Sequence, residues 1–303
     1  MRCIFCKTGT VSESTREHII PESIGNTRHV LPAGFVCGRC NNYFAREIEG
    51  PLLRHESFRN LRARFQVPTK KGRIPSMRGF LLDTELSVGM RVAADGSVEL
   101  RPERHSETDE IHARLYGKAD DPSIIIFPCD MNPPKREMSR LLAKMALETV
   151  ARRLAVRGSL DRFIDESHYD LIRRWTRHGD NLRDWPFHQR QIHPEETYMR
   201  HPTTGLWVRA GYSHDLFITK RWETFFVFCL YGHEFVINVG GPSIKGYEEW
   251  LEDHNGISPV IERVGFQLQQ GLECGEYYLV GDCESGDGAK FDRELSAHWP
   301  TDR

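Results

Sequence analysis

Four of the eight cysteines in this 303-residue chain lie within its first 40 residues, as two closely spaced pairs. Each pair has the form Cys-x-x-Cys, a spacing that bends the backbone so that two thiolates face one ion. Two such pairs complete the tetrahedral coordination that zinc prefers. The sequence therefore predicts a structural zinc site with four ligands: Cys3, Cys6, Cys37 and Cys40. The alternative is two chance pairs of reactive or buried thiols.

Composition narrows the class of protein. The hydrophobic content of 39%, the charged content of 28% and the net charge of -2 are typical of a globular chain, so nucleic-acid binding would need a local basic patch. No run approaches the roughly 18 to 20 apolar residues that cross a bilayer, and the chain opens without an apolar signal segment. We expect a cytoplasmic protein with no membrane partner, whose cysteines are reduced or bound to metal.

Residue periodicity predicts an α+β fold with a small head at 1–66 and a larger mixed α+β domain at 79–303, joined by a basic linker at 68–76. The apolar and turn patterns predict helices at 41–49, 51–65, 134–156, 165–178 and 247–253, and strands at 86–93, 97–101, 123–127 and 277–280, with further strands between 198 and 239.

The interval between the cysteine pairs contains Arg16-Glu17-His18-Ile19-Ile20-Pro21, and the second pair reads Cys37-Gly38-Arg39-Cys40-Asn41-Asn42. With these motifs, the first 50 residues resemble the HNH (ββα-metal) endonuclease family. The resemblance is to the branch in which CxxC pairs bracket an acidic-His dipeptide, an arrangement similar to that of phage endonuclease VII and of many bacterial HNH proteins with an EHIIP signature. It implies a treble-clef-like ββα-metal module around the zinc site.

The resemblance also implies a division of roles. His18 would be the general base that activates water, and Glu17 and Asn41 would hold a catalytic Mg²⁺ or Mn²⁺. These residue types suit the chemistry, because phosphodiester hydrolysis needs a base and a cation that offsets charge on the leaving oxygen. Carboxylate and amide oxygens are the ligands that Mg²⁺ prefers.

The chain departs from the family pattern in places. The acidic ligand is Glu17 where the family commonly has Asp, and Asn41 stands where it commonly has His, with Asn42 as a possible substitute. Asn26 and His29 are both candidates for the middle position, which orients the base or touches a phosphate. Two simpler interpretations stay open: Asn41 as a helix N-cap, and His18 as a surface histidine paired with its neighbour.

A basic stretch follows the motif, with Glu56 as its one acidic residue. We predict that it contacts nucleic acid through Arg54, Arg59, Arg62, Arg64, Lys70, Lys71 and Arg73, with Arg78 at its end. The alternative is a solvated helix face followed by a flexible linker.

These features together predict a metal-dependent HNH endonuclease that hydrolyses DNA, with RNA not excluded as a substrate. One site cuts one strand, so cleavage of both strands would need a homodimer or two successive nicks. The resemblance implies a role in phage defence or in a mobile element. The main alternative is a non-catalytic, zinc-stabilised nucleic-acid-binding protein. A third possibility is a protein-interaction head attached to an active α+β body.

Overall fold

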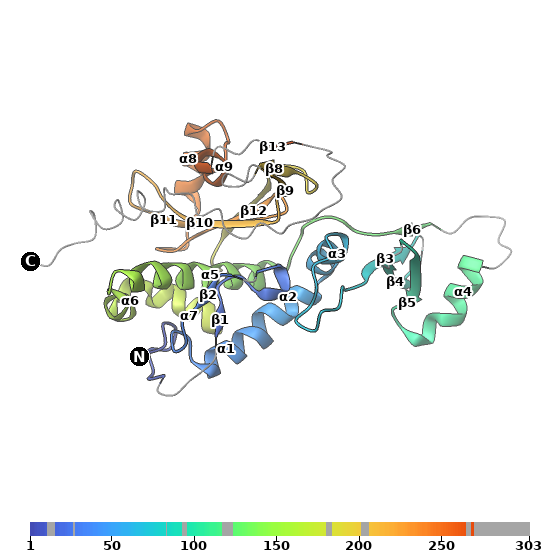
Figure 1. The fold of residues 1–303 in the computed structure, drawn as a ribbon, viewed down its shortest axis with the longest axis horizontal. Helices are drawn as coiled ribbons and strands as arrows, with labels where there is room; N and C mark the ends of the chain where they lie inside the picture. Colours follow the sequence, from blue (N-terminus) through green and yellow to red (C-terminus); the bar gives the residue numbers. More distant parts are fainter. Residues whose placement is uncertain are drawn as a thin grey trace, which may run out of the picture.

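The computed structural model describes residues 1–10, 16–26, 28–82, 84–92, 96–116, 124–179, 184–200, 206–264 and 268–269. The 22-residue helix α5 (Lys135–Val156) lies at its centre. Residues 138–151 of this helix are all buried, because the N-terminal elements pack on one side and a β-sheet packs on the other (Figure 1). No helix among the described residues is long and apolar enough to span a membrane.

The sheet is antiparallel and contains β7 (Phe187–Gln191), β10 (Tyr212–Ile218), β11 (Thr224–Leu230) and β12 (His233–Asn238) in the order β10-β11-β12-β7. Alternate residues of a strand point to opposite faces. Phe226 and Phe228 therefore join the core around α5, while Phe225 and Val227 pack under α8 (Lys245–Asp253) and near α9 (Pro259–Val264). Both faces of the sheet are thus covered.

The N-terminal module begins with a two-stranded antiparallel pair, β1 (Glu17–His18) and β2 (Val30–Leu31), with the short helix η1 (Glu22–Ile24) between them. It continues through α1 (Gly38–Phe44), the π-helical turn η2 (Ala45–Glu49), α2 (Gly50–Arg54) and α3 (Glu56–Arg64). This ββα order agrees with the fold that the motifs predicted.

The predicted start of the first helix was wrong. The helix begins at Gly38, and Cys37 is its N-cap, because the Cys37 Sγ accepts a hydrogen bond from the Cys40 backbone N–H at 3.4 Å. Asn41 lies within the first turns of α1 and has no capping role, so the capping alternative for this residue is excluded.

A satellite subdomain, which we define as β3 to β6 with η3 and α4, projects from α3 (Figure 1). Its antiparallel sheet has the order β5-β4-β3-β6 and a small core of its own around Val88 and Ile111. Its elements are β3 (Met77–Leu81), β4 (Ser87–Val92), β5 (Val98–Pro102), η3 (His105–Glu107), α4 (Thr108–Tyr116) and β6 (Ile125–Ile126).

Helices α6 (Leu160–Asp165) and α7 (Asp170–His178), separated by η4 (Ser167–Tyr169), pack beside α5, where one helix at 165–178 was predicted. Strands β8 (Tyr198–Arg200), β9 (Trp207–Arg209) and β13 (Leu268–Gln269) form a separate antiparallel sheet in the order β13-β8-β9. The predicted strand at 277–280 lies outside the described residues.

One hydrophobic core joins the N-terminal module to the body. Ile20 and Phe44 belong to the same buried cluster as Leu142 of α5, Trp175 of α7 and Phe228 of the sheet. The predicted α+β class is confirmed. The head expected at 1–66 and the domain expected at 79–303 share this core, so their apolar packing does not separate at the linker.

Candidate active site and metal centre

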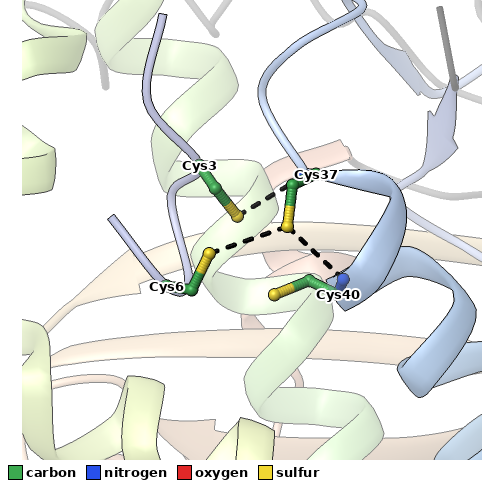
Figure 2. Close-up of side chains that lie close together, drawn as sticks. All are labelled: Cys3, Cys6, Cys37 and Cys40. Atoms are coloured by element: carbon green, nitrogen blue, oxygen red, sulfur yellow. Dashed lines mark hydrogen bonds between the residues drawn. The ribbon is translucent and has the colours of Figure 1, made fainter. Parts of the chain in front are cut away.

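The four predicted zinc ligands come together in space. The sulfur atoms of Cys3, Cys6, Cys37 and Cys40 all lie within 4.8 Å of one another, and those of Cys6 and Cys37 are 3.6 Å apart (Figure 2). One pair lies in the N-terminal turn, and the other lies at the start of α1. This arrangement confirms that the cysteines cluster, and it suggests a zinc-binding site.

Hydrogen bonds to the Cys3 sulfur favour its thiolate form, which is the form that binds a cation. The Cys37 backbone N–H donates to the Cys3 Sγ at 3.4 Å. A hydrogen bond from the Cys40 thiol and several backbone amides lower the pKa of Cys3 to about 5, although burial acts in the opposite direction. Burial raises the pKa of Cys37 to about 11. A zinc ion would deprotonate all four thiols, because the thiolate is the species that binds.

Strand β1 presents the predicted catalytic dipeptide, and its two side chains diverge as strand geometry requires. Glu17 points inward and is only 5% exposed, while His18 is half-buried. The His18 Nδ1 is buried and makes no hydrogen bond to any described residue. The paired register of Glu17 with Leu31 and of His18 with Val30 fixes this alternation.

Lys144 of α5 binds both residues of the dipeptide. Its Nζ lies 2.6 Å from the Glu17 Oε1 and donates to the His18 carbonyl oxygen at 3.2 Å. The same ammonium lies 3.3 Å from a carboxylate oxygen of Glu49 and 3.2 Å from one of Glu148. We call these four residues the Lys144 cluster: Glu17, Glu49, Lys144 and Glu148.

Charge balance decides the protonation of the Lys144 cluster. Burial lowers the pKa of the fully buried Lys144, but the three carboxylates outweigh burial and hold it well above its ordinary value. Burial also raises the pKa of Glu148 well above the usual range, against the opposing effect of Lys144. Lys144 is therefore a charged ammonium, and it already neutralises the carboxylate that the family motif assigns to a metal.

The amide residues after the second cysteine pair lie on α1. Asn41 is half-buried, Asn42 is exposed, and the Asn41 backbone N–H donates to the Cys37 carbonyl oxygen at 2.9 Å. The structure gives no hydrogen bond between the Asn41 side chain and Glu17 or His18 within the residues it describes. The proposed metal role of Asn41 therefore rests on the motif alone.

Asn26 is fully buried and holds the loop between β1 and β2. Its Nδ2 donates to the Ile20 carbonyl at 2.7 Å and to the His29 carbonyl at 3.1 Å, while its Oδ1 accepts from the Arg28 and His29 backbone N–H groups. The Tyr212 hydroxyl also donates to this Oδ1, at 3.2 Å. Asn26 thus braces the hairpin that carries His18.

His29 faces the body of the protein. Its ring lies edge-on to His214 at a centroid distance of 4.7 Å, and its Nδ1 accepts a hydrogen bond from Arg152 at 3.1 Å. Burial and the nearby Arg152 and Arg28 lower the pKa of His29 to about 4. His29 is therefore neutral near pH 7 and serves the interface with β10 and α5.

The seven basic residues predicted to bind nucleic acid divide into two groups. Three are engaged inside the fold: Arg59 pairs with Glu103, Arg64 pairs with Glu195, and Arg62 is only 4% exposed. The other four are exposed, namely Arg54, Lys70, Lys71 and Arg73.

Sequence reasoning missed Lys144, Glu49 and Glu148. The available signal was an i,i+4 Lys-Glu pair inside the apolar sequence of α5, where Lys144 lies between Ala143 and Met145. A charged pair surrounded by apolar residues on a fully buried helix is seldom solvated, so it needs an internal partner. That partner could not be identified without the fold.

Residues 3–57 match the model of the HNH endonuclease family. The match covers 55 of the 303 residues, and it contains both cysteine pairs, β1, β2 and α1. No curated protein and no solved structure matches the chain. The N-terminal module thus matches the HNH endonuclease family over these residues, which suggests nuclease activity and implies a nucleic-acid substrate.

Replacing one cysteine should release the metal and destabilise the module. We expect purified protein to contain one zinc per chain, and Cys37→Ser to contain none and to unfold at a lower urea concentration, because structural zinc supplies folding free energy. The exposed Cys129, which lies outside the cluster, provides the control Cys129→Ser. Zinc retained by Cys37→Ser would contradict the four-cysteine site.

Removing the Lys144 ammonium should lower the free energy of unfolding. Lys144→Met leaves buried carboxylates without their counter-ion, and we expect the free energy of unfolding to fall by about 3–5 kcal/mol in urea titrations at pH 7. Lys135→Met removes an exposed lysine of the same helix and should change the unfolding free energy by less than about 0.5 kcal/mol. If Lys144→Met changed the unfolding free energy as little as Lys135→Met does, the Lys144 cluster would contribute nothing to stability.

The buried His29 should make stability depend on pH. Its pKa is about 4 in the folded protein and about 6.5 in the unfolded chain, so its contribution is complete above pH 6.5 and is lost as the pH falls towards 4. The expected loss is roughly 3 kcal/mol. Urea titrations between pH 7 and pH 4 should show a shallower decline for His29→Phe than for the exposed control His105→Phe. If stability declined equally with pH in the two variants, His29 would not be the cause of the pH dependence.

Proposed function

We propose that the HNH endonuclease module hydrolyses phosphodiester bonds in DNA with the help of a divalent metal ion. The proposal rests chiefly on the family match at residues 3–57, over a segment whose four cysteines cluster and fix the start of α1. The formation of the β1–β2 pair beside this cluster supports it further.

His18 is the proposed general base. Its imidazole projects from β1 on the side opposite to Glu17 and is half-buried, and its Nδ1 makes no hydrogen bond to any described residue. A neutral imidazole takes a proton from water as the water attacks phosphorus. The Lys144 contact to the His18 carbonyl and the Asn26 brace on the following loop hold this strand in place. We assign both as positioning residues.

Glu17 and Asn41 are the proposed ligands of the metal. Their carboxylate and amide oxygens are hard donors, so the donor types fit Mg²⁺ or Mn²⁺. Such an ion, when bound, offsets the negative charge that develops on the phosphate and on the leaving oxygen. Because the Glu17 Oε1 already contacts the Lys144 ammonium at 2.6 Å, the lysine and the ion would share one carboxylate.

One observation favours a second candidate function, a zinc-stabilised nucleic-acid-binding protein without catalysis. Lys144 supplies the positive charge next to Glu17 that a metal ion would otherwise supply, and Glu17 is only 5% exposed. In either case residues 79–303 would form the accessory part. For the nuclease, cutting both strands would require a homodimer or two successive nicks.

Substitution of His18 separates the two functions. We expect the wild-type protein to nick plasmid DNA only when Mg²⁺ or Mn²⁺ is added, and His18→Ala to lower the single-turnover rate by about 10²- to 10⁴-fold, because a general base contributes that much. His105→Ala, in the exposed helix η3, is the matched control and should cleave at the wild-type rate.

If His18→Ala still nicks DNA at the wild-type rate, His18 is not the general base. If the wild-type protein binds DNA but cleaves none with either metal ion, the binding-protein function replaces the nuclease proposal.

A further inference from the structure

An open groove of about 570 Å³ lies between the HNH module and the satellite subdomain. Ser23 of η1 and Arg59 of α3 contribute to it from the module, and Arg91 of β4 contributes from the satellite subdomain. Most of the remaining lining comes from the segment between α3 and β3, with Thr69, Lys70, Lys71, Arg73, Ile74, Pro75 and Ser76. We call this feature the basic groove.

The segment that was expected to be a linker forms an ordered turn in this groove. The Thr69 backbone N–H donates to the Arg73 carbonyl, and the Gly72 N–H donates to the Thr69 carbonyl, both at 2.8 Å. Gly72 has a φ of 71°, a conformation that favours glycine. The turn therefore presents Lys70 and Lys71 in a fixed arrangement, which reduces the entropy cost of binding a ligand.

Hydrogen bonds from Arg59 fix the two walls relative to each other. Its guanidinium donates to the Ser76 carbonyl at 2.8 Å and to both carboxylate oxygens of Glu103, at 2.8 and 2.5 Å. Arg59 is thus neutralised by an ion pair of the satellite subdomain. It shapes the basic groove without adding free positive charge to it.

Four other cations give the basic groove its charge. Lys70, Lys71, Arg73 and Arg91 are exposed, and the structure gives their side chains no ion pair or hydrogen bond within the residues it describes. None of the ten lining residues is acidic. In a chain whose net charge is -2, four such cations in one concave surface produce a local positive potential that attracts a polyanion.

The lining chemistry indicates which polyanion. Lysine and arginine side chains with the hydroxyls of Ser23, Thr69 and Ser76 are donors that bind phosphate oxygens. None of the described residues that line it is aromatic, so this part of the basic groove offers no aromatic ring on which unpaired bases could stack. This composition fits the sugar-phosphate backbone of a duplex better than it fits a single strand.

We propose that the basic groove binds the phosphate backbone of double-stranded DNA and directs it to the HNH module. This inference rests on the proposed function. It gives the satellite subdomain a role, since Arg91 on β4 lines the groove. Ser23, which also lines it, follows His18 by five positions in the chain. A duplex held here lies next to the hairpin that carries the proposed base.

Fluorescence anisotropy with a labelled 20-base-pair duplex, in EDTA and at several salt concentrations, tests this proposal without any cleavage. The variant Lys70→Ala/Lys71→Ala/Arg73→Ala/Arg91→Ala should bind about 10- to 100-fold more weakly at 0.1 M salt. The slope of log K against log salt should fall in magnitude by roughly 0.9 for each lost phosphate contact. Arg91→Ala alone should lower the slope by about 1.

Arg221→Ala and Lys245→Ala are matched controls. Both remove exposed cations that pair with Glu249, and neither residue lines the basic groove. We expect wild-type affinity and slope for both. A wild-type slope in the fourfold variant, or an unlabelled single strand that competes as well as the duplex, would overturn the proposal.

The readout keeps this proposal separate from the nuclease proposal. Binding in EDTA that depends on the basic groove supports the inference even if no cleavage is ever detected. Conversely, the fourfold variant could nick DNA with added metal and with the wild-type KM. That result would support the nuclease proposal and refute DNA binding by the basic groove.

Discussion

The ion cluster around Lys144 connects the HNH module to the rest of the protein. A fully buried ammonium is tolerated only when carboxylates compensate the loss of hydration, and here Glu17, Glu49 and Glu148 do so. Glu17 comes from the hairpin, Glu49 from the π-helical turn after α1, and Glu148 from the same helix as the lysine. The position of β1 is therefore set by the position of α5.

This dependence extends beyond electrostatics. The turn that carries Cys3 and Cys6 is held against α7, because the Arg173 guanidinium donates to the Ile4 carbonyl at 2.9 Å. The first helix is tied to α5 through a hydrogen bond from Arg140 to the Tyr43 hydroxyl, also at 2.9 Å. Together with the shared hydrophobic core, these contacts mean that α5 supplies part of the interior that the module would need in order to fold.

Sequence reasoning succeeded where chemistry is local and failed where it depends on distant partners. The spacing of Cys3, Cys6, Cys37 and Cys40 was sufficient to predict their cluster. Thiols three positions apart can face one ion, and two such pairs complete a tetrahedral set of ligands. The helix at 134–156 was predicted within one residue of its start, since its apolar residues recur at helical spacing.

Which basic residues are free to bind nucleic acid depends on the fold. Arg59, Arg62 and Arg64 were indistinguishable from Lys70 and Lys71 as sequence, yet α3 places the three arginines against Glu103, the interior and Glu195. Arg91 was not predicted to bind nucleic acid, because it reaches the basic groove only through the pairing of β3 with β4. A count of basic residues therefore could not separate the three arginines that pack inside the fold from the four exposed basic residues, Arg54, Lys70, Lys71 and Arg73.

The Lys144 cluster and the basic groove impose a common requirement on the proposed chemistry. Because Lys144 offsets part of the charge of Glu17, protein donors alone offer a divalent ion less attraction than a free carboxylate would. Mg²⁺ sites are commonly completed by substrate phosphates, which add the missing negative charge. Under the proposed function, a groove that concentrates phosphate beside the hairpin would strengthen ion binding as well as substrate binding, and the metal site would be complete only with DNA bound.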